Sequence, residues 1–336
     1  MAEILTVLSA VLPVFLITFL GYQFRRINWL TRDADDSLMK VAMNVLLPCL
    51  AFSKISGNEA IRQPENVWLP PVVGFFSIAI GMAIGWMVRR YATGETGPKA
   101  RTYAITIGVF NFGFVPIPLS ESLFGENAVA VLFVFNVGTL LAMWSLGVML
   151  LHGDLGTAWK KALNAPFLSV VFALIVNATG LNVHIPEVVV TSIEMLGMCA
   201  IPMSILLMGA MMKDYFAECE FRSAFRVCWT SILLRMGLLP VLMIVTAKWL
   251  PCSTELRQVI LIQASMPAAM FPILISRMYG GSPVIATQVA IATTVISLAT
   301  IPLWLHLGAA FLGLNSQTAP AFRFNDSTLK LALQLK

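Results

Sequence analysis

Apolar windows of about 20 residues recur along the whole chain, and this is the length that a helix needs to cross about 30 Å of hydrocarbon. The composition, 58% hydrophobic and 12% charged over 336 residues, is too apolar for an ordinary globular domain. We therefore predict an all-α polytopic membrane protein. The first window follows Glu3 without a basic segment or a cleavage site, so we interpret it as a mature span. The ten expected spans are 4–24, 35–55, 67–88, 102–122, 127–151, 165–181, 187–212, 224–247, 257–277 and 284–311.

The basic residues of the loops predict the orientation of these spans. Loops after odd-numbered spans contain most of the basic residues: Arg25, Arg26, Arg32, Arg89, Arg90, Lys99, Arg101, Lys160, Lys161, Lys213, Arg222, Arg226 and Arg277. Loops after even-numbered spans contain only Lys54, Arg62, Lys248 and Arg257. The positive-inside rule places the first group in the cytoplasm, so both termini are expected outside a cell (inner) membrane. Because the basic residues collect in particular loops, the net charge of +5 indicates no nucleic-acid partner.

The fourth predicted span contains residues that a helix does not tolerate. Gly113, Pro116 and Pro118 fall within six residues, and each proline lacks an N–H group and clashes with the preceding turn. Unpaired backbone groups at membrane depth are tolerated only where protein or a water-filled cavity meets them. We expect the helix to break here, with Asn111 at the break, and this predicts half of a substrate site in a transporter.

A shift of 154 residues brings similar features into register. It places Pro118 on Pro272 and the fourth span on the ninth, where the stretch Gln263–Pro272 predicts a second break. We predict two inverted repeats of five helices, 1–151 and 165–311, joined by a cytoplasmic linker 152–164 and followed by a polar tail 312–336. The alternative is that two ordinary helices each have an independent proline kink.

Broken helices expose half-helix N-termini, which favour anions. Asn111 and its counterpart Ser265 are candidates to bind a carboxylate, and the alternative for each is to cap its own half-helix. The remaining residues expected at a substrate site between the breaks are Gly113, Pro116, Pro118, Met266 and Pro267.

Charged and amide residues within other spans are further candidates. Lys40 either lines the substrate path or extends to the headgroups, and the shift places it on Glu194, a possible ion or proton handle. Arg235 either binds a substrate carboxylate or forms a structural pair. Asn136 and Gln288 bind ligand or bond between helices. Glu121, which closes the fourth span, is either interfacial or a second proton or cation handle.

The two break sequences resemble the auxin efflux carrier family, which includes plant PIN exporters and bacterial carboxylate or malonate permeases. The resemblance rests on Asn111 with Pro118-Leu119, on Met266-Pro267 with Pro272 and Tyr279-Gly280, and on Leu298–Leu303. It covers about residues 4–311. Phe110 and Pro116 depart from the plant pattern and the long plant cytoplasmic loop is absent, so auxin itself is not the expected substrate.

This resemblance implies broken helices 4 and 9 that cross, as in bile-acid symporters and sodium–proton antiporters. Helices 1, 2, 6 and 7 would form a scaffold, helices 3–5 and 8–10 a transport unit that moves like an elevator, and the protein would be a homodimer.

The sequence can be compared with three classes of function: an organic-anion carrier, an ion-coupled exchanger and an enzyme. A secondary or facilitated carrier of small organic anions, such as malate or malonate, agrees best with the paired breaks. A sodium- or proton-coupled exchanger or symporter of the same fold is the alternative, although neither break contains an acidic residue. No nucleophile–base pair, phosphate loop or metal-ligand spacing indicates an enzyme, and no cofactor is expected.

Overall fold

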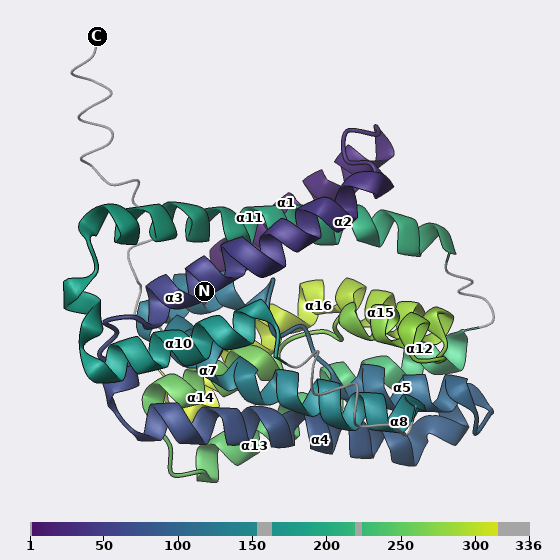
Figure 1. Cartoon of the computed structure of the whole chain (residues 1–336). Coiled ribbons are helices and arrows are strands. Elements are labelled where there is room, and N and C mark those ends of the chain that lie inside the picture. The colour runs from purple at the N-terminus through teal and green to yellow at the C-terminus, as the bar shows by residue number, and fades with distance from the viewer. Residues whose placement is uncertain (1, 153–162, 219–223, 315–336) are drawn as a thin grey trace.

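The computed structural model describes residues 2–152, 163–218 and 224–314 (Figure 1). The regular secondary structure of these residues is helical, and their only β-type pairing is one isolated bridge. By length and composition, six helices of the described residues can cross a membrane: Arg32–Ile55, Glu65–Thr93, Glu126–Leu151, Glu187–Ala217, Phe225–Trp249 and Pro283–Leu312. The prediction of an all-α polytopic protein is therefore confirmed in this coarse form. The predicted linker and tail lie mostly outside the described residues.

The first half of the chain contains α1 (Ala2–Arg26), α2 (Arg32–Val41), η1 (Ala42–Leu46), α3 (Leu47–Ile55), η2 (Ala60–Arg62), α4 (Glu65–Thr93), α5 (Pro98–Gly108), α6 (Pro116–Phe124), α7 (Glu126–Ala142), η3 (Met143–Gly147) and α8 (Val148–His152). The second contains α10 (Ala165–Thr179), η4 (Leu181–His184), α11 (Glu187–Glu218), α12 (Phe225–Ser231), η5 (Ile232–Leu238), α13 (Leu239–Trp249), α14 (Thr254–Ala264), α15 (Phe271–Met278) and α16 (Pro283–Leu312).

Several predicted spans are not simple long helices. The ranges 102–122 and 257–277 are each divided into two short helices, and α10 has only 15 residues. Three other spans stay continuous through π-helical segments: η1, η3 and η5. Ten crossings and an inverted repeat therefore stay predictions.

Glycines allow two pairs of long helices to approach closely. A Cβ atom on Gly209 of α11 would lie 1.9 Å from the carbonyl oxygen of Thr18 on α1. A Cβ atom on Gly138 of α7 would lie 1.7 Å from the carbonyl oxygen of Pro71 on α4. Small residues are typical of contacts between membrane helices, because packing rather than hydrophobic burial drives their association.

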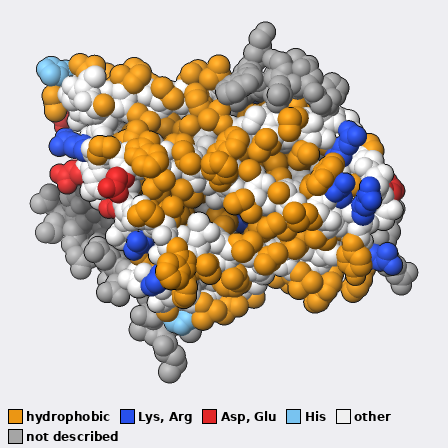
Figure 2. Space-filling model, turned by 90° about the horizontal axis from the view of Figure 1, so that it is seen from below, with side chains coloured by type: hydrophobic (Ala, Val, Ile, Leu, Met, Phe, Trp, Pro, Cys, Tyr) orange, Lys and Arg blue, Asp and Glu red, His pale blue; other side chains and the backbone are white. Residues whose placement is uncertain are grey.

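The outer surface has the distribution of polarity that a bilayer requires. Figure 2 shows a mostly hydrophobic face with the charged side chains gathered toward its ends. Large apolar side chains are exposed on the long helices, among them Phe76 and Ile80 of α4 and Leu298 of α16. In water such a surface would be a large interaction patch, whereas lipid covers it at no cost.

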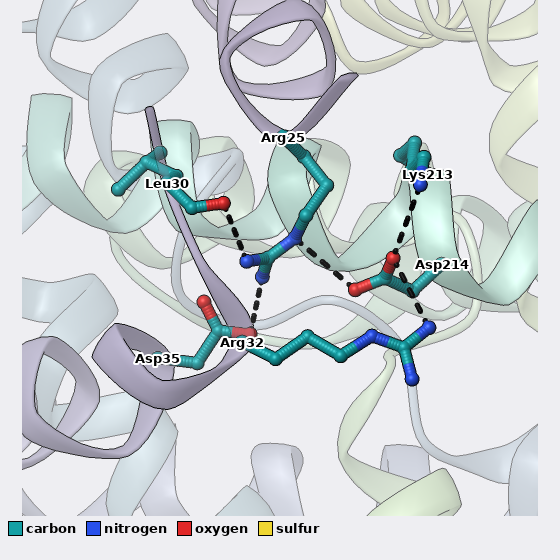
Figure 3. Close-up of polar contacts among 6 residues, drawn as sticks. All are labelled: Arg25, Leu30, Arg32, Asp35, Lys213 and Asp214. Atoms are coloured by element: carbon teal, nitrogen blue, oxygen red, sulfur yellow. Dashed lines mark hydrogen bonds and ion pairs between the residues drawn. The ribbon is translucent and has the colours of Figure 1, made fainter. Parts of the chain in front are cut away.

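A cluster of ion pairs joins the end of α1 to α2 and α11 (Figure 3). The side chain of Arg25 is only 3% exposed, pairs with Asp35, and has its Nε 3.1 Å from Asp214 Oδ2. Its Nη1 donates a hydrogen bond to the carbonyl of Leu30 at 2.6 Å, and Arg32 lies 3.3 Å from Asp214. Arg25 and Arg32 therefore bind carboxylates of the protein, which a count of loop charges does not reveal.

Adding a methyl group at Gly138 tests the close packing of α4 and α7. We expect Gly138→Ala to lower the free energy of unfolding by about 1–3 kcal/mol, because the new atom would overlap the Pro71 carbonyl. Gly237→Ala is the control, since no atom lies within 4 Å of its Cβ position. Thermal unfolding of the purified protein in detergent measures both, and equal melting temperatures would contradict the described packing.

Removing the buried guanidinium tests the ion-pair cluster. Arg25→Met leaves Asp35 and Asp214 without their shared cation, so we expect a loss of about 3 kcal/mol of stability. The matched variant Arg26→Met, next to it but exposed, should change stability by less than about 0.5 kcal/mol. Denaturation of the two variants side by side makes the comparison; a loss at Arg26 as large as that at Arg25 would refute the role of the cluster.

Candidate functional site

The two helix breaks meet in the middle of the molecule. The first comprises residues 109–115 between α5 and α6, and the second comprises residues 265–270 between α14 and α15. Phe110 and Ala268 form an antiparallel bridge, in which Asn111 N donates to Pro267 O at 2.8 Å and Ala269 N donates to Val109 O at 2.9 Å. We call these two paired segments the crossover. The predicted breaks are confirmed, and each satisfies backbone groups of the other.

Prolines start the second helix of each interrupted pair. Pro116 and Pro272 lie in the first turns of α6 and α15, where a missing N–H group has no helical partner to lose. Pro116 is buried and Pro118 is partly buried. These prolines therefore define where each second half-helix begins, whereas α5 and α14 already end at Gly108 and Ala264.

Two buried amides support the first break from behind. Asn136 of α7 donates its Nδ2 to the carbonyl of Phe112 at 2.7 Å. Gln263, in the last turn of α14, donates Nε2 to Asn136 Oδ1 at 3.2 Å, and its own Oε1 has no hydrogen-bond partner. Asn136 therefore bonds between helices, one of its two predicted roles. The sequence predicts Gln263 only as the start of the second break; an amide residue just before the prolines is the signal for its role.

Hydroxyl groups support the second break. Thr293 of α16, which sequence reasoning missed, accepts a hydrogen bond from Ala268 N at 3.1 Å. A threonine within an apolar span carries little signal, because most such hydroxyls bond their own helix. The fully buried Ser265 donates its Oγ to the carbonyl of Leu261 at 2.9 Å, so it caps its own half-helix.

Arg235 lies behind the crossover on the π-helical segment η5. It is 1% exposed, and its Nε donates to the carbonyl of Met266 at 3.0 Å and its Nη2 to that of Gln263 at 3.2 Å. Its guanidinium carbon is 4.8 Å from the centre of the Phe110 ring. Arg235 therefore contacts both breaks and forms a structural pair with backbone carbonyls.

One side of the crossover remains open. Asn111 is partly buried, and its Nδ2 lies 3.7 Å from the sulfur of Met208 on α11. No atom lies within 4 Å of the Cβ position of Gly113, and Phe112 and Phe114 are also only partly buried. A ligand approaching from this side would meet the Asn111 amide.

The structure gathers many of the predicted site residues at the crossover and leaves others apart. At the crossover or bonded to it are Asn111, Gly113, Pro116, Ser265, Met266, Pro267, Asn136 and Arg235. Gln288 is buried on α16, whereas Lys40 and Glu194 are exposed, and no ion pair joins these two in the described part of the chain. Glu121 accepts a hydrogen bond from Lys54 at 2.7 Å, and Lys54 also pairs with Glu126 at 2.7 Å. Glu121 thus has a cationic partner.

A comparison with protein families agrees with this geometry. The model of the membrane transport protein family matches residues 6–157 and 154–305, so together the matches cover most of the chain. The chain belongs to the membrane transport protein family. The prediction of a transporter and of its relation to auxin efflux carriers is confirmed, and the family and its relatives are transporters, not enzymes.

Relatives of this transporter are found in archaea and in plants. A transporter of Methanothermobacter thermautotrophicus is 23% identical over 88% of the chain and 96% of its own length. A second archaeal transporter, from Methanocaldococcus jannaschii, is 22% identical over 88% of the chain and 97% of its own length. Auxin efflux carrier component 8 of Arabidopsis thaliana is 22% identical over 89% of the chain and 96% of its own length. The similarity therefore extends over nearly the whole transporter.

The amide pair behind the crossover can be tested with a double-mutant cycle. Because Asn136 and Gln263 bond each other, Asn136→Leu and Gln263→Leu should not be additive, with a coupling energy of about 0.5–3 kcal/mol in unfolding. The control cycle combines Asn136→Leu with Asn177→Leu, since Asn177 bonds Gly57 and Asn58 and shares no partner with Asn136. Additive losses in the first cycle would show that the amides do not act together.

Proposed function

We propose that this transporter carries small organic anions, mono- or dicarboxylates such as malate or malonate, and binds them at the open side of the crossover. The observation that carries the proposal is the position of Asn111. Its amide is partly accessible at the crossover, whereas its backbone N–H is already bonded to Pro267. The amide therefore does not have to hold the break, and its weak hydrogen bond to Met208 Sδ can give way to a carboxylate.

The charge balance of the crossover supports an anion. Neither break, 109–115 or 265–270, contains an acidic residue, and the buried guanidinium of Arg235 lies against both. The N-termini of α6 and α15 add partial positive charge at the same place. Because Arg235 already bonds the carbonyls of Gln263 and Met266, the helix N-termini that remain at the crossover favour a carboxylate over a cation.

The mechanism we propose is elevator-type alternating access, with the substrate between a scaffold and a moving unit. The contact of Asn111 with Met208 supports it, because it places the open side of the crossover against α11 of the proposed scaffold. In this proposal, ten crossings form two inverted halves in a homodimer of the cell inner membrane, with both termini outside. In the numbering of the ten predicted spans, spans 1, 2, 6 and 7 are the scaffold, and spans 3–5 and 8–10 move.

Facilitated transport is sufficient for export. An anion that leaves a negative-inside cell gains about 2.3 kcal/mol per charge for every 100 mV, so no coupled ion is needed. Of the two acidic residues predicted as ion or proton handles, Glu121 is paired with Lys54 and Glu194 is exposed. A sodium- or proton-coupled exchanger therefore ranks second.

Flux through liposomes tests the site. We expect Asn111→Ala to raise the KM for carboxylate flux about tenfold to a hundredfold, because a hydrogen bond to a charged group contributes about 1.5–3 kcal/mol. Radiolabelled malate, malonate and monocarboxylates are the probes. Asn182→Ala is the matched control, since Asn182 is also partly buried but lies in η4, outside the crossover. Unchanged flux of every carried substrate by Asn111→Ala would refute the proposed site.

A further inference from the structure

Arg235 is a buried cation without a carboxylate partner. It is 1% exposed within the candidate span Phe225–Trp249, and in the described part of the chain no ion pair joins it to an acidic residue. A charge in such a place is costly unless hydrogen bonds and opposite partial charges compensate it. The compensation here comes from two backbone carbonyls and one aromatic face.

The two carbonyls lie where the regular helix stops: Gln263 O accepts a three-residue bond from Met266 N at 3.2 Å, because its helical partner Pro267 has no N–H group. Gln263 lies in the last turn of α14, which ends at Ala264, and Met266 lies in the break itself. The C-terminal carbonyls of a helix carry its partial negative charge. In membrane carriers, carbonyls of this kind at an unwound segment coordinate small cations such as Na⁺. The guanidinium of Arg235 donates to them instead.

The local structure of η5 and the chemistry of arginine suit this task. A π-helical segment departs from the regular α-helical spacing of side chains, and such segments are frequent at functional sites. A planar guanidinium bonds two separate oxygens with fixed geometry while its face lies on an aromatic ring, which a lysine ammonium does not do. Arg235 does this with Met266, Gln263 and Phe110.

We propose that Arg235 is a tethered cation of the crossover. Its guanidinium donates to the carbonyl oxygens of Gln263 and Met266, which a dissolved alkali ion would otherwise coordinate. It therefore keeps the two breaks paired whatever ions are present. Arg235 is then a positioning residue, which acts on Asn111 through the paired backbone rather than by touching the substrate. The chain itself thus supplies the positive charge that these carbonyls bind. This proposal does not depend on whether the substrate is an organic anion.

Chemical rescue tests the proposal without any substrate. Thermal unfolding of the purified full-length chain is measured for the wild type and Arg235→Ala, each in low, equal concentrations of guanidinium, sodium or choline chloride. We expect Arg235→Ala to unfold at a lower temperature, and guanidinium to raise that temperature by several degrees more than choline does. The wild type should show no preference among the three ions.

Arg257→Ala is the control variant, because Arg257 lies on α14 but outside the crossover. Its melting temperature should not respond selectively to guanidinium. A folded Arg235→Ala that responds equally to the three ions, or a wild type that itself needs sodium, overturns the proposal.

A second pair of variants decides the matter if Arg235→Ala does not fold. Arg235→Lys keeps the charge, whereas Arg235→Met has a similar length without charge. We expect Arg235→Lys to be clearly more stable than Arg235→Met, and equal behaviour of the two, including failure of both to fold, overturns the proposal. Since no substrate takes part, a failed carboxylate flux assay leaves this result unaffected, and the reverse also holds.

Discussion

A polar backbone group in the interior of a bilayer must be bonded within the protein, because the bilayer core offers no water. An unbroken helix meets this demand by itself, but the two broken helices here cannot. The two breaks meet it together, through the antiparallel pairing of Phe110 with Ala268 and the bonds of Asn111 and Ala269. Asn136, Thr293 and Arg235 from neighbouring helices bond further backbone groups of the breaks. The arrangement of helices around the crossover follows from this demand.

The same demand separates structural from accessible polar groups. Asn136, Ser265 and Arg235 are bonded to backbone carbonyls, so their hydrogen-bonding capacity is largely used by the fold. Asn111 contributes its backbone to the pairing and keeps its side chain toward the open side and α11. A transport site in the membrane needs both kinds of group, because a break that exposes a ligand site must also be stabilised from behind.

Three cations of the chain show two ways to compensate charge in an apolar protein. Arg25 pairs with two carboxylates, one from α2 and one from α11. Lys54 pairs with Glu121 of α6 and Glu126 of α7. Arg235 uses carbonyls and an aromatic ring. In the sequence all three are basic residues in or near apolar windows. The loop count that predicts the orientation includes Arg25 and Lys54 but does not show that Arg25 is buried.

The sequence by itself determined the class of protein and the location of the breaks. Window length and composition predict a polytopic membrane protein, and Gly113 with the prolines of 116–118 and 267–272 predicts the interruptions, because these effects act within a few residues. Only the tertiary structure decided which groups the interruptions bond. Gln263, Thr293 and Arg235 meet the crossover from α14, α16 and η5, and a contact between distant helices leaves no local pattern. Lys40 and Glu194 correspond by position in the chain yet are exposed without a mutual ion pair in the described residues, because packing determines which face of a helix is buried.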